Sequence, residues 1–339
     1  MEKLKLALYW AASCGGCEIA VLDLGERILD LAAIADIVFW PVALDFKYRD
    51  VETLPDNSID VCLFNGGVRT SENEHMARLL RAKSKVLVAF GSCAHLGGIP
   101  GLANVTNRAG VFDVVYRDTA STVNGDGLQP QPVCQVPEGE LRIPRFYNSV
   151  RPLGQVVPVD YYQPGCPPDT EQIWNVVQAI AGARLPTPGS VVGASDRTLC
   201  DECDRIKEEK KVKQFYHISE IVPDPKRCLL EQGVVCCGPA TRGGCGQRCL
   251  NANMPCRGCY GPAPGVADQG AKLISAISSV LDSEDPREID RTLSKIGDPL
   301  GTFYRFSFPS SLMARARVQE PPMVAAPSSL MAGARVSQP

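Results

Sequence analysis

The segment Leu4–Cys17 reads LKLALYWAASCGGC and decides which fold we predict for the chain. Its first half, Leu4–Trp10, is an apolar run of strand length, and a Cys-Gly-Gly-Cys sequence follows soon after it. Farther along the chain, apolar strands alternate with helix-length segments. This alternation predicts an α/β domain with a mostly parallel sheet, whose functional loops leave the carboxyl ends of the strands.

The alternation continues for about 185 residues. The strands expected from it are Leu4–Trp10, Ile37–Pro41, Ile59–Phe64, Val86–Phe90 and an extended stretch over Val156–Tyr162. The helices expected from it lie near Glu18–Ala33, Ser71–Lys83 and Gln172–Ala183. Residues 101–155 are rich in Pro, Gly, Asn and Gln, and we interpret them as a long irregular excursion. We therefore assign residues 1–190 to the sheet domain.

Cysteines dominate the next part of the chain. Nine of the 15 cysteines lie between Cys200 and Cys259, where glycines are frequent and periodicity is weak. Such a stretch cannot bury much apolar surface, so we predict a small metal-stapled domain over residues 191–300, with an amphipathic helix at Ala267–Asp282. In residues 301–339, PSSLMARARV (309–318) is nearly repeated as PSSLMAGARV (327–336), and we predict an extended or disordered tail.

The composition argues against several classes of protein. A net charge of −3 provides no basic field for nucleic acid, and an odd number of cysteines cannot all pair as disulfides. No apolar run reaches the roughly 18 residues of a membrane span. The first residues, MEKLKLALYW, show no secretory leader, so we expect a cytoplasmic protein whose clustered thiols bind metal.

Three loops at the carboxyl edge of the expected sheet carry cysteines. These are Cys14, Cys17, Cys93 and Cys166. The two cysteines of a CxxC pair can bind one metal centre from a single turn, while the other two ligands come from separate loops. Glycines near these cysteines permit the tight backbone that a buried cluster needs. The alternative is a thioredoxin-like redox pair at Cys14 and Cys17, with the other two thiols free.

Two further sets of four cysteines lie in the cysteine-rich stretch. The second set is Cys200, Cys203, Cys228 and Cys236, and the third is Cys245, Cys249, Cys256 and Cys259. Each supplies the four thiolates that a [4Fe–4S] cluster takes, although four-cysteine zinc sites have similar spacing. Cys237 directly follows Cys236, so either of these two can be the fourth ligand of the second set.

These motifs resemble a known family. Cys14-Gly-Gly-Cys17, Gly91-Ser-Cys93-Ala and Pro164-Gly-Cys166-Pro-Pro are similar to the proximal-cluster motifs of [NiFe]-hydrogenase small subunits. CLLEQGVVCCGP (228–239) and PCRGCYGP (255–262) resemble the distal and medial motifs of that family. The likeness covers most of the chain. It implies a flavodoxin-like domain followed by a small irregular iron–sulfur domain.

Differences from other hydrogenase small subunits indicate which subgroup of that family the chain resembles. Cys200 stands where membrane-bound uptake enzymes use a histidine, and the third set offers four cysteines where theirs has three. Together with PATRGGCGQRC (239–249) and GGIPGLAN (97–104), these features resemble the cytoplasmic methyl-viologen-reducing type, which works with heterodisulfide reductase. Deazaflavin-reducing hydrogenases and hydrogen-sensing regulatory subunits are alternatives. The small cluster subunit of a quinone-reducing complex shares the first domain but typically lacks the eight-cysteine segment.

The resemblance implies an electron relay. The NiFe centre that splits H2 would belong to a large-subunit partner. Electrons would then pass through a proximal [4Fe–4S] cluster held by the first cysteine set, a medial cluster held by the third and a distal cluster held by the second, to an acceptor subunit. Glu18 would lie near the proton path of the large subunit. The mixed-charge run Arg205–Lys213 is expected to be a solvated helix face or, alternatively, a docking rim for the acceptor.

Overall fold

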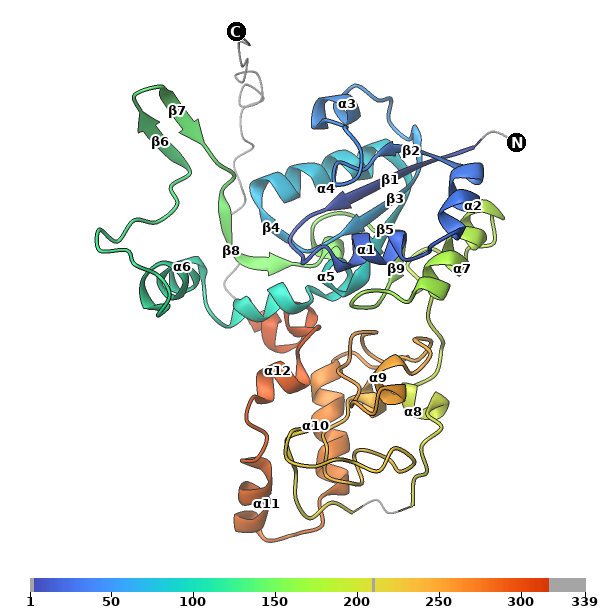
Figure 1. Cartoon of the computed structure of the whole chain (residues 1–339), viewed down its shortest axis with the longest axis vertical. Helices are drawn as coiled ribbons and strands as arrows, with labels where there is room; N and C mark the ends of the chain where they lie inside the picture. The colour runs from blue at the N-terminus through green and yellow to red at the C-terminus, as the bar shows by residue number, and fades with distance from the viewer. Residues whose placement is uncertain (1–2, 209–210, 317–339) are drawn as a thin grey trace.

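The computed structural model describes residues 3–208 and 211–316, which form two parts (Figure 1). The N-terminal part is built on a parallel sheet. The C-terminal part, which contains most of the cysteines, lies below it in the view of Figure 1. The α/β class expected from the sequence is thereby confirmed.

The sheet contains five strands in the order β2-β1-β3-β5-β9. Their bounds are β1 Leu4–Trp10, β2 Ala35–Phe39, β3 Ile59–Asn65, β5 Ser84–Phe90 and β9 Tyr161–Gln163. Counted in chain order, this is the 2-1-3-4-5 arrangement of flavodoxin-like folds. Because all neighbouring strands are parallel, the loops that follow β1, β5 and β9 meet at one edge, which we call the carboxyl edge.

Helices cover both faces of the sheet. The helices on one face are α1 (Gly16–Leu22), α2 (Arg27–Ile34) and α7 (Thr170–Ala181), and those on the other are α3 (Tyr48–Glu52), α4 (Ser71–Lys83) and α5 (Gly91–Leu96). In β1, Leu8 faces the first three helices, whereas Ala7 and Tyr9 face the other three. Burial on both faces explains the continuous apolar runs in the strands.

The single helix expected near Glu18–Ala33 is instead two helices, α1 and α2. The chain turns at residues 23–26, where Gly25 has a φ of 61°. The amide of Gly25 donates to the carbonyl of Leu22, which ends α1. Because residues with a side chain rarely adopt this left-handed backbone, the glycine marks a break that apolar periodicity alone did not reveal.

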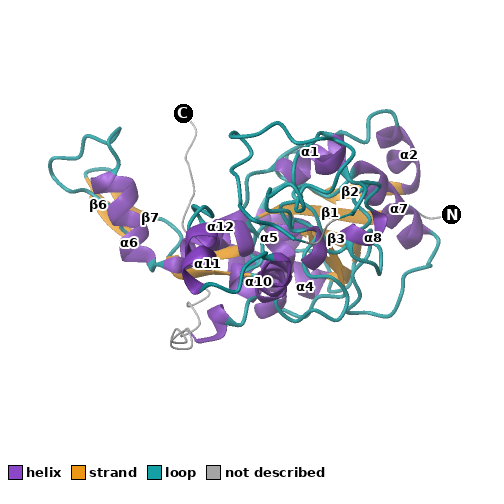
Figure 2. Cartoon of the chain, turned by 90° about the horizontal axis from the view of Figure 1, so that it is seen from below, coloured by secondary structure: helices purple, strands orange, loops and turns teal. Residues whose placement is uncertain are grey.

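The excursion expected over residues 101–155 contains more regular structure than predicted. Its elements are η1 (Ile99–Val105), α6 (Arg108–Asp113), η2 (Val114–Asp118), β6 (Val133–Val136), β7 (Gly139–Arg142), β8 (Phe146–Arg151) and η3 (Leu153–Gln155). The β6–β7 hairpin and α6 stand away from the sheet (Figure 1 and Figure 2). β8 returns to the domain and pairs with β4 (Val68–Thr70). Asn104 anchors the base of the excursion, because its side chain bonds both the amide and the carbonyl of Val150.

The C-terminal part is largely irregular, as the sequence indicated. Its helices are α8 (Leu199–Glu202), η4 (Gly238–Ala240), α9 (Arg248–Asn251), α10 (Gln269–Val280), α11 (Pro286–Leu293), α12 (Pro299–Phe303), η5 (Phe308–Ser310) and η6 (Met313–Ala316). α10 corresponds to the helix expected at Ala267–Asp282, and its Leu273 and Ile277 enter a small core shared with cysteine side chains. A domain boundary near residue 190 stays a prediction. None of the helices in the described residues is long and apolar enough to span a bilayer.

The extended or disordered tail expected from residue 301 is wrong for the residues up to 316. We call residues 304–311 the C-terminal segment. It buries Tyr304, Phe306 and Phe308, and the carbonyl of Phe306 accepts a hydrogen bond from the amide of Gly98 in the sheet domain. The second copy of the repeat and the rest of residues 317–339 lie outside the described residues.

Two glycines explain why the C-terminal segment is ordered. A Cβ on Gly97 would lie 2.3 Å from the ring of Pro309, and a Cβ on Gly101 would lie 2.2 Å from it. Pro309 therefore packs onto backbone that carries no side chain. Composition alone suggested disorder, because a contact between residues so far apart in sequence leaves no local signal.

The mixed-charge run Arg205–Lys213 is not the helix expected, as far as its described residues 205–208 and 211–213 show. Arg205 is buried, and its guanidinium donates to the carbonyls of Asp224, Arg227 and Leu250 and to the side chain of Asn253. A guanidinium offers five N–H donors, and here they bind oxygens from separate loops. These hydrogen bonds hold the backbone around Arg205 in an irregular conformation.

Candidate functional site

The carboxyl edge brings together Cys14, Cys17, Cys93 and Cys166, which we call the edge group. Burial, and then the thiols of Cys93, Cys166 and Cys14, raises the pKa of Cys17. The pKa of Cys93 is raised to about 12 by burial and then by Cys166 and Cys14. The pKa of Cys166 is raised by burial and then by Cys14. All four thiols are therefore close enough for the charge on one to act on the others.

Glycines leave the backbone bare around the edge group. A Cβ on Gly91 would lie 2.4 Å from Sγ of Cys17, and a Cβ on Gly98 would lie 2.4 Å from Sγ of Cys93. Both glycines have a positive φ, 83° at Gly91 and 58° at Gly98, which other residues rarely adopt. The sulfurs thus lie against backbone, whose amides can face the sulfurs of a bound cluster.

A second group of cysteines, here called the far group, lines one cavity in the C-terminal part. Its members are Cys200, Cys203, Cys228 and Cys236. Leu199, Leu230 and Leu250 complete an apolar wall. Burial, followed by the nearby thiol of Cys236, raises the pKa of Cys200 to about 12. Lys207 lies at the rim, where its ammonium donates to the carbonyl of Cys200 over 2.6 Å.

The neighbouring thiols of Cys236 and Cys237 have different surroundings. Cys236 lines the far-group cavity, and its charge interacts with those of Cys228 and Cys203. The thiol of Cys237 instead lies 3.6 Å from the carbonyl of Thr302 and does not line that cavity. The structure therefore brings Cys236, rather than Cys237, to the other three members.

The third group, here called the middle group, comprises Cys245, Cys249, Cys256 and Cys259. Burial, followed by the thiol of Cys245, raises the pKa of Cys259 to about 12, and Cys249 contributes in the same direction. Burial, followed by the thiols of Cys236 and Cys237 outside the group and then of Cys259 within it, raises the pKa of Cys256. The four thiols lie in the loops and short helix between η4 and α10.

The three groups form a series, with the middle group between the other two. On one side, the hydroxyl of Ser92 lies 2.9 Å from the carbonyl of Gly165 and 2.5 Å from the carbonyl of Cys259. It thereby links the edge group to the middle group. On the other side, the amide of Cys237 donates to the carbonyl of Cys256 over 3.0 Å, linking the middle group to the far group.

The donor chemistry of the three groups fits iron–sulfur clusters. All 15 cysteines are free thiols, and thiols buried beside one another stay protonated until a metal displaces their protons. Within residues 3–208 and 211–316, no three His, Cys, Asp or Glu side chains lie close enough to hold a single metal ion. A four-iron cluster is larger than a single metal ion and is held by thiols that lie farther apart, because each of its four irons binds one thiolate.

Glu18 is buried beside Cys17 on the sheet side of α1. The indole N–H of Trp40 donates to Oε2 of Glu18, and the amide nitrogen of Asn65 lies 3.5 Å from Oε1. Burial raises the pKa of Glu18, while these two hydrogen bonds act in the opposite direction. A buried carboxyl with a raised pKa is able to hold a proton. Nothing in the sequence around Trp40 indicates that its side chain contacts Glu18.

Exposed apolar side chains gather at the carboxyl edge. Trp10 ends β1, Ile19 and Leu22 lie on α1, and Val42 and Leu44 follow β2. Cys14 is exposed in the same region. Clusters of exposed apolar side chains mark surfaces that bind other proteins. The edge group therefore lies beside a surface suited to a protein partner.

Sequence reasoning missed two contributors to the site. Ser92 connects two cysteine groups, and the only hint was its place between Gly91 and Cys93 in a cysteine motif. The C-terminal segment holds the sheet domain against the C-terminal part, as the hydroxyl of Ser310 donates to the carbonyl of Leu96 over 2.9 Å. Neither contact is encoded in local sequence.

Comparison with family models gives a match to the N-terminal part. Residues 14–180 match the family described as NADH ubiquinone oxidoreductase, 20 Kd subunit. The matched range contains every member of the edge group and ends before the far and middle groups. This family therefore accounts for the first domain and not for the cysteine-rich part.

Relatives with known names cover nearly the whole chain. The iron–sulfur subunit of an F420-non-reducing hydrogenase from Archaeoglobus profundus is 41% identical over 316 residues, which are 91% of this chain and 98% of that protein. The corresponding F420-non-reducing hydrogenase subunit from Methanothermobacter marburgensis is 35% identical over 320 residues, 92% of this chain and 96% of that protein. Among solved structures, a chain of an NAD+-reducing [NiFe]-hydrogenase in the H2-reduced state aligns with 31% identity and a TM-score of 0.47, covering 55% of this chain and 94% of that one.

Proposed function

Because the chain belongs to the family of iron–sulfur subunits of F420-non-reducing hydrogenases, we propose that it relays electrons through three [4Fe–4S] clusters. As a hydrogenase small subunit it has a large-subunit partner, to which the catalytic NiFe site belongs. The observation that carries the proposal is the series of edge, middle and far groups, each with four thiols. A series of this kind offers a path from one end of the molecule to the other.

In this proposal each cysteine group holds one cluster. The edge group holds the proximal cluster, the middle group the medial cluster and the far group the distal cluster. When bound, the clusters supply one-electron carriers, and the protein sets their position, their insulation from water and their potentials. The chain does so through apolar walls such as Leu199 and Leu250, through bare backbone at Gly91 and Gly98, and through Ser92 between two groups.

The large subunit binds the carboxyl edge in this proposal. The exposed Trp10, Ile19 and Leu22 supply an apolar surface there, and obligate interfaces are rich in such residues. Glu18, buried beside Cys17, would then lie next to the proton path of the large subunit. The far group would lie away from this interface, with Lys207 at its rim for an acceptor subunit.

For the acceptor we propose a further iron–sulfur subunit linked to heterodisulfide reductase. This partner is inferred from the type of hydrogenase that the cysteine motifs resemble. The same resemblance leads us to propose that the complex acts in the cytoplasm. Purification of the native complex, followed by identification of its subunits, tests the proposed acceptor, and a signalling kinase in place of a reductase would contradict it.

Metal analysis is expected to show iron in all three groups. Three four-cysteine groups predict about 12 iron atoms and about 12 acid-labile sulfides per chain. Elemental analysis and sulfide determination on the anaerobically purified complex measure both quantities. Zinc in stoichiometric amount at the far and middle groups, with only about four irons, would show that the second part is a zinc domain.

Cross-linking is expected to show which face the large subunit occupies. An obligate interface buries on the order of 2,000 Å² or more, so residues beside the carboxyl edge should cross-link to the large subunit. Lys47, in the loop after β2, is the probe at this edge, and Lys207 and Lys213 are matched probes near the far group. Lysine cross-links mapped by mass spectrometry in the intact complex give the answer. Large-subunit links confined to Lys207 and Lys213 would reverse the proposed polarity.

A further inference from the structure

A second cavity lies in the C-terminal part, beside the middle group and outside the proposed electron path. Its volume is about 320 Å³, within the size range of small-molecule sites. Its walls come from residues 215–218, 234–235, 255, 257, 295–298, 302 and 305. Pro255 and Arg257 flank Cys256, so the cavity adjoins a cysteine of the middle group without being lined by one.

Three cations line the cavity, and two of them, Arg257 and Arg305, lie close enough to the Cys237 thiol to oppose the rise in its pKa that burial causes. Arg257, Lys295 and Arg305 line it, and no side chain in the described residues forms an ion pair or hydrogen bond with them. Nε of Arg305 is buried and has no acceptor. Cations without an ion-pair partner give the cavity a wall that favours an anionic ligand.

The one carboxylate that lines this cavity is already occupied. Oδ1 of Asp298 accepts a hydrogen bond from the amide of Gly301 over 2.8 Å and so caps α12. Asp298 is thereby turned toward the start of its own helix. The cavity keeps a net positive charge, because it is lined by three cations and one carboxylate.

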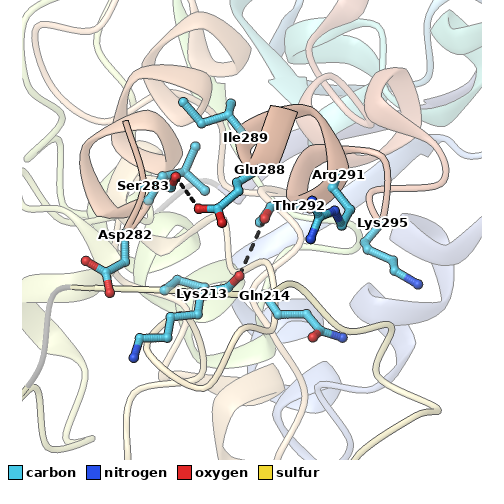
Figure 3. Close-up of a pocket in the computed structure, with 11 residues that line it drawn as sticks. Lys213, Gln214, Asp282, Ser283, Glu288, Ile289, Arg291, Thr292 and Lys295 are labelled. Atoms are coloured by element: carbon cyan, nitrogen blue, oxygen red, sulfur yellow. Dashed lines mark hydrogen bonds between the residues drawn. The ribbon is translucent and has the colours of Figure 1, made fainter. Parts of the chain in front are cut away.

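The neighbouring cavity shows the contrast (Figure 3). It shares Lys295 with the first, but Asp282 and Glu288 there offset Lys213 and Arg291. Glu288 accepts a hydrogen bond from the hydroxyl of Ser283 over 2.7 Å. Figure 3 shows the side chain of Lys295 extending away from Glu288. Lys295 is therefore available to the first cavity, whose one carboxylate, Asp298, caps α12.

Apolar residues form the rest of the wall. Phe215 and Val234 are buried, and Tyr216, Ile218 and Ile296 also face the space. An inorganic ion gains no affinity from an apolar wall, whereas a ligand with an apolar ring can bury that ring against it. The cations would bind its charged head, since guanidinium groups make paired hydrogen bonds to phosphate and carboxylate oxygens.

We propose that the cavity lined by Arg257, Lys295 and Arg305 binds a small organic anion, with a phosphate or carboxylate head on an apolar ring. The head contacts the three cations, and the ring contacts the partly exposed Tyr216, Ile218 and Ile296. The proposal does not depend on which electron acceptor the complex uses.

Calorimetric titration of the purified complex with its large subunit tests the proposal. The probes are phenyl phosphate and benzoate. Inorganic phosphate and phenol are the controls, because each supplies only the charged head or only the ring of phenyl phosphate. We expect one saturable site per chain for phenyl phosphate or for benzoate, at least about tenfold tighter than for either half. Which of the two probes binds more tightly identifies the head group. A loss of about tenfold in affinity is expected for Arg305→Gln and for Lys295→Gln, because each removes one charge-assisted contact.

Lys213→Gln is the matched control, since it removes a cation from the neighbouring cavity and should leave the affinity unchanged. Lys295 is exposed, so its variant stays informative even if Arg305→Gln fails to fold. Absence of saturable binding to both organic probes would overturn the proposal. Equal affinity in the wild-type protein and the Lys295→Gln variant would overturn it as well.

Discussion

Alanine at position 91 is expected to remove the proximal cluster, whereas alanine at position 189 should leave it intact. The two glycines have similar positive φ angles, 83° at Gly91 and 91° at Gly189. Alanine therefore meets a similar backbone penalty of about 1–2 kcal/mol at both positions. They differ in space, because a Cβ on Gly91 would lie 2.4 Å from Sγ of Cys17, whereas a Cβ on Gly189 has no atom within 4 Å.

The pair of variants separates cluster geometry from backbone strain. In Gly91→Ala, Cys17 must move away from the position that a cluster needs, and we expect H2-dependent reduction of a viologen dye to fall roughly 100-fold. Iron analysis should show a loss of about four irons in Gly91→Ala and none in Gly189→Ala. If both variants lost iron to the same extent, backbone strain and not the contact with Cys17 would be the cause.

Serine at position 236 is expected to remove the distal cluster, whereas serine at position 237 should be tolerated. Cys236 lines the far-group cavity with the other three thiols, while the Cys237 thiol lies against the carbonyl of Thr302. A hydroxyl can replace that thiol as a donor to the carbonyl, so Cys237→Ser should cost less than about 1.5 kcal/mol.

Iron content and acceptor reduction measure this difference. We expect Cys236→Ser to lose about four irons and to stop reducing the protein acceptor, because the last carrier is missing. Cys237→Ser should keep about 12 irons. The opposite pattern would place Cys237 in the far group and would mean that this loop changes its conformation when the cluster binds.

The sequence predicted the sheet well, because strands buried on both faces leave a strong local signal. The runs at Leu4–Trp10 and Val86–Phe90 correspond to β1 and β5, and the capped helix Ser71–Lys83 has the bounds expected. Helix capping explains the last result, since the side chain of Thr70 accepts a hydrogen bond from the amide of Asn73.

Features that depend on distant contacts could not be predicted. The order of the C-terminal segment rests on Pro309 meeting Gly97, and the shape of the chain around Arg205 rests on oxygens from later loops. For the candidate site, motif spacing selected the twelve cysteines, and the structure brings each set of four into one region. The different surroundings of Cys236 and Cys237 could not be predicted, because adjacent residues have nearly the same spacing to every other cysteine.

The C-terminal segment also has a consequence for synthesis of the chain. Ser310 bonds to Leu96 across a sequence separation of 214 residues, and Pro309 covers bare backbone beside the edge group. Domains generally fold as they leave the ribosome, in order from the N-terminus. The sheet domain emerges first, yet its surface near Cys93 stays open until almost the whole described chain has been translated. In the proposed relay, the proximal cluster would be inserted most easily before residues 304–311 pack against Gly97 and Gly101.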